Sequence, residues 1–253
     1  MNRFLNSLIH CNNMAVASAK DTKRSTEMLR TGLIELKQIM HEKEITDTDD
    51  SHSIGDCCSG TANHDVSQYI SIDRVPLPSF CNHNDDCTTT GGIFSFFDKA
   101  LTVSINQTMT DQLNELSNEI LMRLATVLVY NLGLFHHCSV LSSTTNIVGS
   151  KQADLQKALN FYQMALTFPS EGGFDIKNSD MILIFALHNN MGHIYSIQNA
   201  NSVQSQDCFT VMQSILQEND AVEFCLSEEE YLFFLKTITL YSDSSMSFAA
   251  AAA

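Results

Sequence analysis

A four-residue phrase with asparagine in its second position occurs three times along this chain of 253 residues. It reads NNMA at residues 12–15, YNLG at 130–133 and NNMG at 189–192, and a second apolar segment follows each copy. Self-similarity of this kind is typical of stacked helical hairpins, each of which buries its apolar face against the next. The phrase therefore predicts a helical repeat array, a fold that commonly serves as a binding scaffold.

Each copy resembles helix A of the tetratricopeptide repeat (TPR), in which a Leu-Gly pair is followed three residues later by Tyr. Helix B of that repeat carries Ala, a large apolar residue four positions later, and Ala three positions beyond it. The small residues let two helices approach closely, and the aromatic side chain fills the space between repeats. On this pattern the packing positions of the chain are Met14, Ala15, Leu132, Gly133, Ala158, Tyr162, Ala165, Met191, Gly192, Tyr195, Cys208 and Met212.

The apolar spacing predicts an all-α fold, a TPR-like array of antiparallel helical hairpins (an α-α superhelix) without strands. Residues 1–40 are expected to form the first repeat-like hairpin, with Asp21 capping its second helix. Residues 93–245 are expected to form the rest of the array. Its last, capping helix opens at a capping box formed by Ser227 and Glu230.

The helices expected within the array share apolar residues at helical spacing. They cover residues 94–101, 109–142, 155–168, 182–197, 203–216 and 228–241. Pro169 and the glycines at 172–173 are expected to end the third of these helices. A flexible tail is expected over residues 246–253.

Two segments interrupt the helical pattern. Residues 41–66 contain seven acidic residues against one lysine and few aliphatic side chains. Such a segment cannot offset its ordering entropy, so we expect a disordered acidic insert. Residues 67–92 are expected to form an extended strap on the helical surface and a loop, because Pro76 and Pro78 enforce an extended path.

The chain as a whole resembles a large, diverse family of TPR-like helical proteins from diatoms. The resemblance rests on an Asn-Leu-Gly-Leu-x-His-His element at residues 131–137, an Asn-Asn-Met-Gly-x-Ile element at 189–194 and a Cys-Phe pair at 208–209. An extended strap before the array and an alanine-rich C-terminal segment fit the same pattern. The resemblance implies the TPR-like fold, and it carries no assigned activity.

The formal net charge of −15 argues against several classes of partner. A surface this acidic repels phosphate backbones and anionic lipid, so we expect no nucleic-acid and no membrane partner. No stretch approaches the roughly 20 apolar residues that span a bilayer, and the N-terminal segment lacks the apolar core of a cleavable signal. Eight cysteines are too few for a disulfide scaffold, which favours an intracellular, cytoplasmic protein.

The asparagine of each phrase falls where helix A of a TPR array faces the concave groove. A side-chain amide there can both donate to and accept from the backbone of a bound peptide. The candidate groove lining comprises Asn13, Asn131, Leu134, His137, Asn189, Asn190, His193 and Ser196. Two interpretations stay open: the asparagines bind a partner, or they bond neighbouring helices or a loop packed into the groove.

We therefore expect a non-catalytic protein–protein interaction scaffold, an adaptor that binds a peptide or helix in the groove without cofactor or metal. No GxSxG, HExxH or phosphate-loop motif occurs in the sequence. One alternative is a closed structural subunit whose groove is filled by residues 67–80 of the same chain. Another is a metal- or redox-dependent protein that uses the cysteines of the predicted loops. These are Cys57, Cys58, Cys81 and Cys87.

Overall fold

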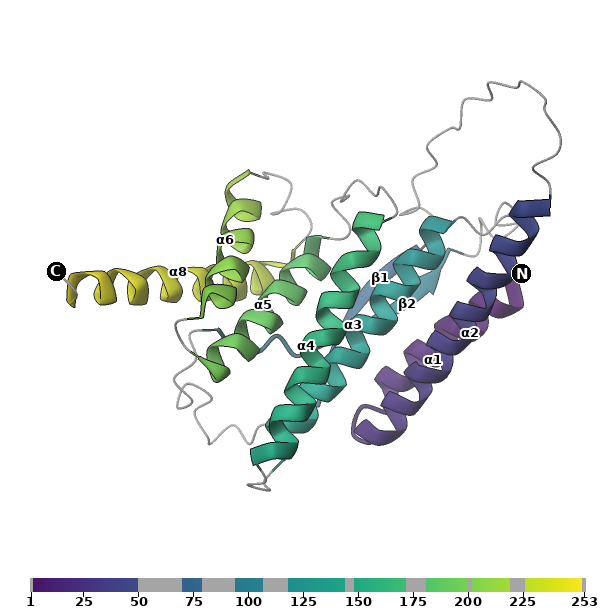
Figure 1. Cartoon of the computed structure of the whole chain (residues 1–253), viewed down its shortest axis with the longest axis horizontal. Coiled ribbons are helices and arrows are strands. Elements are labelled where there is room, and N and C mark those ends of the chain that lie inside the picture. The colour runs from purple at the N-terminus through teal and green to yellow at the C-terminus, as the bar shows by residue number, and fades with distance from the viewer. Residues whose placement is uncertain are drawn as a thin grey trace.

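In the computed structural model, the protein is mostly helical and has one small antiparallel sheet (Figure 1). The described residues are 2–49, 70–78, 94–106, 118–143, 148–171, 181–199, 202–218 and 226–251. Their helices are α1 (Asn2–Ala17), α2 (Thr22–Asp49), α3 (Asn118–Ser142), α4 (Val148–Glu171), α5 (Met181–Gln198), α6 (Val203–Glu218) and α8 (Glu228–Ala251). Their strands are β1 (Ile70–Pro76) and β2 (Lys99–Ile105). The predicted helical class is confirmed.

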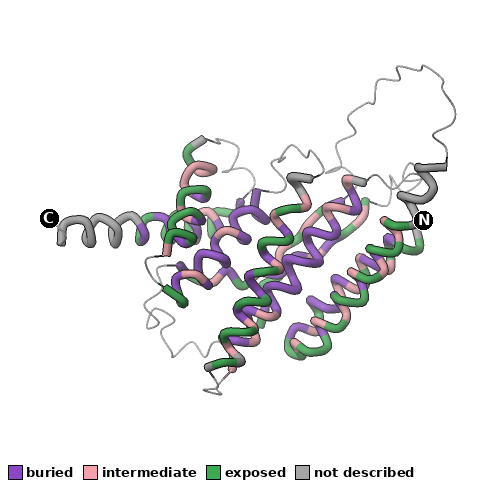
Figure 2. Tube along the Cα trace, in the orientation of Figure 1, coloured by how far each residue is buried: buried purple, intermediate pink, exposed green. Residues whose placement is uncertain are grey.

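The helices pack against one another in chain order. Contacts run from α1 to α2, α3, α4, α5 and α6 in succession, and α6 in turn contacts α8. Figure 1 shows the sheet behind the row of helices, with α8 extending away from it toward the C-terminus. Strand β2 contacts both α1 and α3. Helix α3 is consequently buried on nearly every side, as Figure 2 shows.

Two helices begin at the caps that the sequence predicts. The carboxylate of Asp21 accepts a hydrogen bond from the N–H of Arg24 at 3.0 Å, which caps α2. Before α8, the N–H of Ser227 donates to the Glu230 carboxylate at 3.0 Å. The N–H of Glu230 donates in return to the Ser227 hydroxyl at 3.3 Å. This reciprocal pair is a capping box, so both predicted caps are confirmed.

Glu230 also ties α8 to the sheet. Its carboxylate lies 3.1 Å from Arg74 of β1 and 3.3 Å from Lys99 of β2, and its side chain is only 2% exposed. Burial alone would raise the pKa of Glu230, but the Ser227 hydrogen bonds and the two cations outweigh burial and hold the pKa below its usual value. The ionised carboxylate therefore links the last helix to both strands.

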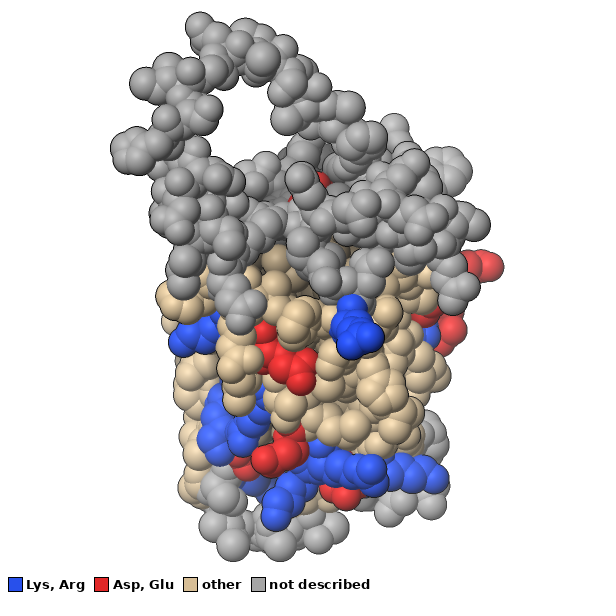
Figure 3. Space-filling view, turned by 90° about the vertical axis from the view of Figure 1, so that its right-hand side faces the viewer, with Lys and Arg blue, Asp and Glu red and all other residues tan. Residues whose placement is uncertain are grey.

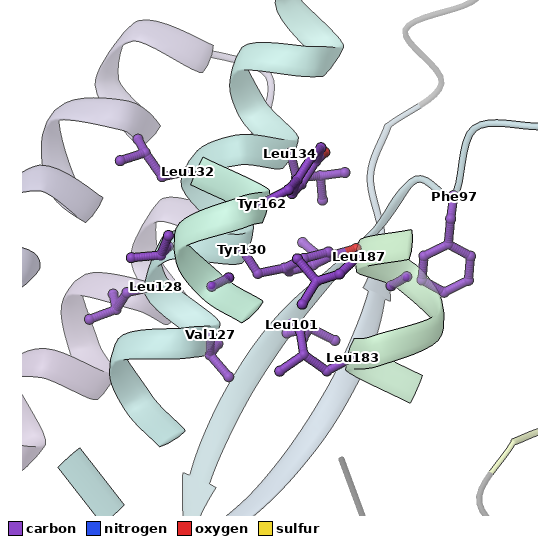
Figure 4. Packing of buried hydrophobic residues seen from close by; sticks show 14 of the residues in the cluster. Phe97, Leu101, Val127, Leu128, Tyr130, Leu132, Leu134, Tyr162, Leu183 and Leu187 are labelled. Atoms are coloured by element: carbon purple, nitrogen blue, oxygen red, sulfur yellow. The ribbon is translucent and has the colours of Figure 1, made fainter. Parts of the chain in front are cut away.

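The centre of the hydrophobic core lies where β2 meets α3, α4 and α5. Figure 4 shows Leu101 of β2 among core side chains that include Val127 of α3 and Leu183 of α5. Helices α3 and α4 approach closely at Gly133, where an added Cβ would lie 2.8 Å from the Tyr162 ring. The small residue thus lets the two helices approach closely, as expected from the sequence.

The expectation of a chain without strands is wrong. β1 and β2 pair antiparallel, with Ile72 opposite Val103. The helix expected over residues 94–101 is also wrong, because residues 94–98 are not helical and β2 follows them. Ala100, Leu101 and Val103 are all buried. Residues 101–105 alternate apolar and polar side chains, which is the pattern of a half-buried strand, but Phe94, Phe97 and Leu101 also fit helical spacing.

The bounds of three helices also differ from the sequence-based expectations. Helix α2 continues to Asp49, so the expected disordered insert is helical over residues 41–49; its remainder, 50–66, lies outside the described residues. Helix α4 begins at Val148 rather than at residue 155, and it continues past Pro169, which was expected to end it. Helix α8 continues to Ala251, so most of the expected flexible tail is helical.

Helix α3 differs from the expectation that no stretch approaches membrane-spanning length. Among the described helices, it is the one whose length and composition would allow it to cross a bilayer. Of its apolar window, 83% is buried within the protein. The neighbouring helices and β2 therefore cover most of its apolar surface.

The face formed by α1 and α2 carries charges of both signs (Figure 3). Its basic side chains gather toward the turn that joins the two helices, where Lys20, Lys23 and Arg24 are exposed. Asp21 and Glu27 are exposed beside them. Intermixed exposed charges contribute little to stability, since surface ion pairs are worth about 0–1 kcal/mol.

We predict that Gly133→Ala lowers the free energy of unfolding by about 2 kcal/mol, because the added methyl group must displace the Tyr162 ring in a packed core. Gly149→Ala is the matched control, since a Cβ at this α4 position would meet nothing within 4 Å. The control should be neutral or stabilise by about 0.5 kcal/mol. Chemical denaturation followed by circular dichroism measures both changes, and equal destabilisation would contradict the close approach of α3 and α4.

Candidate functional site: an asparagine face that holds an extended segment

The predicted groove asparagines pair with the backbone of one segment of the same chain. We call residues 94–105, which comprise β2 and the approach to it, the inner segment. Asn13 of α1 accepts from the Val103 N–H at 3.0 Å and donates to the Val103 carbonyl at 2.8 Å. Asn131 of α3 accepts from the Leu101 N–H at 2.9 Å and donates to the Leu101 carbonyl at 2.7 Å. Each side-chain amide thus makes the two hydrogen bonds with one residue that a neighbouring strand would make.

Helix α5 repeats this arrangement at the other end of the inner segment. Asn190 accepts from the Phe97 N–H at 2.9 Å and donates to the Phe97 carbonyl at 3.0 Å. Asn189 donates to the Ser95 carbonyl at 2.8 Å. One amide can reach both the N–H and the C=O of a single residue only where that residue is extended. The pairing therefore requires an extended chain at Phe97, just before β2 begins.

Two further side chains complete the contact. The hydroxyl of Tyr130 donates to the Lys99 carbonyl at 2.9 Å. The amide of Asn12 donates to the Leu101 carbonyl at 2.9 Å, and its oxygen accepts from Asn131 at 2.8 Å. Asn12 and Tyr130 do not belong to the groove lining predicted from the sequence. Both stand immediately before a predicted groove asparagine, so their position was the signal that could have found them.

The two edges of the inner segment have different partners. Peptide groups alternate in direction along an extended strand. The odd-numbered residues from 95 to 103 direct theirs toward α1, α3 and α5, where side chains receive them. The even-numbered residues face β1, as the bond from the Leu77 N–H to the Asp98 carbonyl (3.0 Å) shows. The inner segment thus pairs with β1 along one edge and with side chains of the helices along the other edge.

In this structure the asparagines bond a packed segment of the same chain. Asn131, Asn189 and Asn190 are fully buried and Asn13 is half-buried, all against the inner segment. The groove holds a packed segment of the same chain. Of the expected stretch 67–80, residues 70–76 form β1 on the far edge of β2, whereas β2 itself contacts α1 and α3; residues 67–69 and 79–80 lie outside the described part of the chain.

The two predicted groove histidines form a buried pair. The His137 Nε2 lies 3.0 Å from the His193 Nδ1, and the Tyr162 hydroxyl lies 3.4 Å from the His137 Nδ1. The Phe96 ring of the inner segment covers the pair, 4.5 Å from the His137 ring centroid and 5.8 Å from that of His193. Burial lowers the pKa of His193 to about 4. Burial, followed by the charge of His193, lowers the pKa of His137 well below its usual value.

The other predicted site residues lie within the helical packing. Leu134 belongs to the hydrophobic core, and the Ser196 hydroxyl donates to the His193 carbonyl of its own helix at 2.8 Å. Met14 and Tyr195 are half-buried, and the Tyr195 hydroxyl accepts from a glutamine of α4. The remaining predicted packing positions are buried: Ala15, Leu132, Gly133, Ala158, Tyr162, Ala165, Met191, Gly192, Cys208 and Met212.

No set of three or more His, Cys, Asp or Glu side chains is arranged to hold a metal ion in the part of the chain that the structure describes. The cysteines of the metal or redox alternative, Cys57, Cys58, Cys81 and Cys87, lie outside the described residues. That alternative stays a prediction from the sequence.

Comparisons with protein-family models, with curated proteins and with solved structures found no match to this chain. The resemblance to TPR-like proteins of diatoms therefore also stays a prediction. We call Asn13, Asn131, Asn189 and Asn190 the asparagine face, and its geometry is the evidence for a function.

We predict that Asn131→Ala lowers the free energy of unfolding by about 3 kcal/mol. The change leaves the buried Leu101 N–H without its acceptor and removes a donor from the Leu101 carbonyl, and a buried unsatisfied group costs about 1–3 kcal/mol. Asn160→Ala removes the same amide from the exposed face of α4 and should change stability by less than about 0.5 kcal/mol. Urea denaturation compares the two variants. Similar values would contradict the assignment of Asn131 to the inner segment.

We also predict that stability falls as the pH is lowered from 6.5 toward 4. The unfolded chain binds a proton at His193 with a pKa near 6.5, whereas the folded chain binds it only near 4. In this range the unfolded state therefore holds more protons, and His193 alone should cost about 2 kcal/mol at pH 5. Thermal unfolding of His193→Gln should show a weaker loss between pH 7 and pH 5. His10→Gln, at an exposed position of α1, should keep the wild-type slope. A wild-type slope in His193→Gln would contradict the burial of this pair.

Proposed function

We propose that the protein is a non-catalytic protein–protein interaction scaffold, a TPR-like array whose asparagine face binds an extended polypeptide through its backbone. The observation that carries the proposal is the two-point pairing of Asn13, Asn131 and Asn190 with one backbone residue each. Backbone pairing supplies affinity for any extended chain, as when a peptide adds a strand to the edge of a sheet. In this function the asparagines are the binding residues.

The inner segment is then an internal ligand, which a partner segment replaces. A tethered segment acts at an effective concentration on the order of mM. An external segment must therefore bind more tightly than the inner segment or be abundant. Without a partner the inner segment occupies the asparagine face, and a partner segment binds by displacing it.

Three observations support the TPR-like arrangement. Consecutive helices contact one another in chain order. Helices α1, α3 and α5 each present an asparagine to the same segment. Gly133 provides the close contact between a helix pair that the repeat needs. The proposal includes a protein or peptide partner in the cytoplasm, without cofactor, nucleic acid or membrane. The net charge of −15 supports the exclusion of nucleic acid.

A second candidate is a closed structural subunit in which the inner segment never leaves. The complete burial of Ala100 and Leu101 favours it, since removing them from the core exposes apolar surface. The two candidates differ in one measurable quantity. That quantity is the free energy needed to detach the inner segment, compared with the free energy of global unfolding.

We predict that the inner segment detaches before the protein unfolds. In native-state hydrogen exchange, the amides of Leu101 and Val103 should exchange with an opening free energy at least about 2 kcal/mol below that of Leu128 and Leu132 in α3. Identical opening free energies for both groups of amides would instead support the closed structural subunit.

The same prediction extends to binding from outside. A fluorescent peptide of residues 93–106 should bind the full chain carrying Leu101→Pro at least tenfold more tightly than it binds the wild type. The proline removes the N–H that the internal copy donates to Asn131. Ser104→Ala, an exposed position of β2 that keeps its backbone N–H, is the control and should bind the peptide no more tightly than the wild type does. Equal affinity of wild type and Leu101→Pro, with both folded by circular dichroism, would contradict the proposal.

A further inference from the structure

The inner segment inserts two aromatic side chains into separate places at its α5 end. Phe94 and Phe97 are both buried to 2% exposure, whereas Ser95 and Asp98 are exposed. Side chains three residues apart on an extended chain lie on opposite sides of it. The two rings therefore enter two different sockets rather than one shared pocket.

The Phe94 socket exists because residue 192 is a glycine. A Cβ built at Gly192 of α5 would lie 2.5, 2.6 and 2.8 Å from three atoms of the Phe94 ring. No alanine fits there without moving the ring. On the other side, the Tyr241 ring of α8 lies 5.6 Å from that of Phe94. Gly192 thus leaves room for a ring from the inner segment, in contrast to Gly133, which leaves room for a ring from the next helix.

The Phe97 socket is built from aromatic rings of α8. The ring of Phe97 lies 5.1 Å from that of Phe234 and 5.5 Å from that of Phe233. Phe234 in turn stacks on Phe185 of α5 at 5.1 Å. Figure 4 shows the Phe97 ring at the margin of the core, beside α5. Such tilted and stacked ring pairs add to the free energy of apolar burial.

Backbone pairing and a charge fix the register of the two rings. Asn189 and Asn190 hold the Ser95 carbonyl and the Phe97 peptide groups between the sockets. Two residues after Phe97, the Lys99 ammonium lies 3.3 Å from Glu230 and 3.8 Å from Glu229. The groove thus offers, in order along the bound chain, a ring socket, a backbone clamp, a second ring socket and a carboxylate pair.

We infer that the partner segment is an extended stretch of another protein with the pattern Phe-x-x-Phe-x-Lys, which takes the place of residues 94–99. The inference rests on the proposed function and adds side-chain selectivity to backbone pairing. The inner segment is the template for this pattern, because each of its three anchor side chains meets a group shaped or charged to receive it. The pattern is also cationic, which suits a chain of net charge −15.

The test uses synthetic peptides of residues 93–106 and the full chain carrying Leu101→Pro, with fluorescence anisotropy as the readout. A peptide with Phe94→Ser and Phe97→Ser should bind at least 100-fold more weakly than the natural peptide. A peptide with Phe96→Ser loses a ring that is only half-buried and should bind less than tenfold more weakly. A peptide with Lys99→Gln should bind more weakly at low salt, and this difference should shrink at high salt.

The outcomes separate the inference from the proposed function. If the natural and the doubly substituted peptides bind equally, and both more tightly than a peptide of residues 93–106 that carries Leu101→Pro, backbone binding stands and the aromatic pattern is wrong. If no peptide binds, the proposed function itself fails. Should Leu101→Pro not fold, the full chain carrying Phe94→Ser, whose own segment leaves the Phe94 socket empty, serves as the receptor. Gly192→Ala in the receptor should weaken the natural peptide more than the peptide that lacks Phe94.

Discussion

The structure depends on the pairing of side-chain amides with the edge of a strand. A strand in the core must have partners for the N–H and C=O groups of both edges, because a buried unpaired backbone group costs about as much as a lost hydrogen bond. In the inner segment, β1 supplies the partners on one edge. Asparagines on three helices supply them on the other. This arrangement lets β2 lie directly against α1 and α3 and bury Ala100 and Leu101 among helical side chains.

The spacing of the pairs follows the spacing of the helices. Val103 and Leu101 are two residues apart, or about 7 Å along a strand, and Leu101 and Phe97 are four apart, or about 13 Å. The shorter step joins α1 and α3, which contact each other directly and whose Asn12 and Asn131 share a hydrogen bond of 2.8 Å. The longer step, to α5, leaves one carbonyl between the asparagines. The hydroxyl of Tyr130 in α3 donates a hydrogen bond to that carbonyl, which belongs to Lys99.

The chemistry of the site could be predicted from the sequence, but its occupant could not. A recurring asparagine before a small residue on helix A implies an amide turned toward one common ligand, and the structure has such amides. The segment that the amides hold lies at residues 94–105, where Phe94, Phe97 and Leu101 fit helical spacing although residues 101–105 alternate as a strand does. Contacts across long separations, such as His137 with His193 or Glu230 with Lys99, leave no mark in either local sequence.

The two buried glycines at helix A show why a repeat pattern alone does not distinguish an open groove from a filled one. Gly133 and Gly192 occupy equivalent places in the phrase, and the repeat explains both by close helix packing. In the structure, only Gly133 of these two faces the ring of a neighbouring helix, while Gly192 faces Phe94 of the inner segment. Gly192 accommodates a ring of the inner segment and Gly133 a ring of the next helix, so the same phrase serves two different kinds of packing.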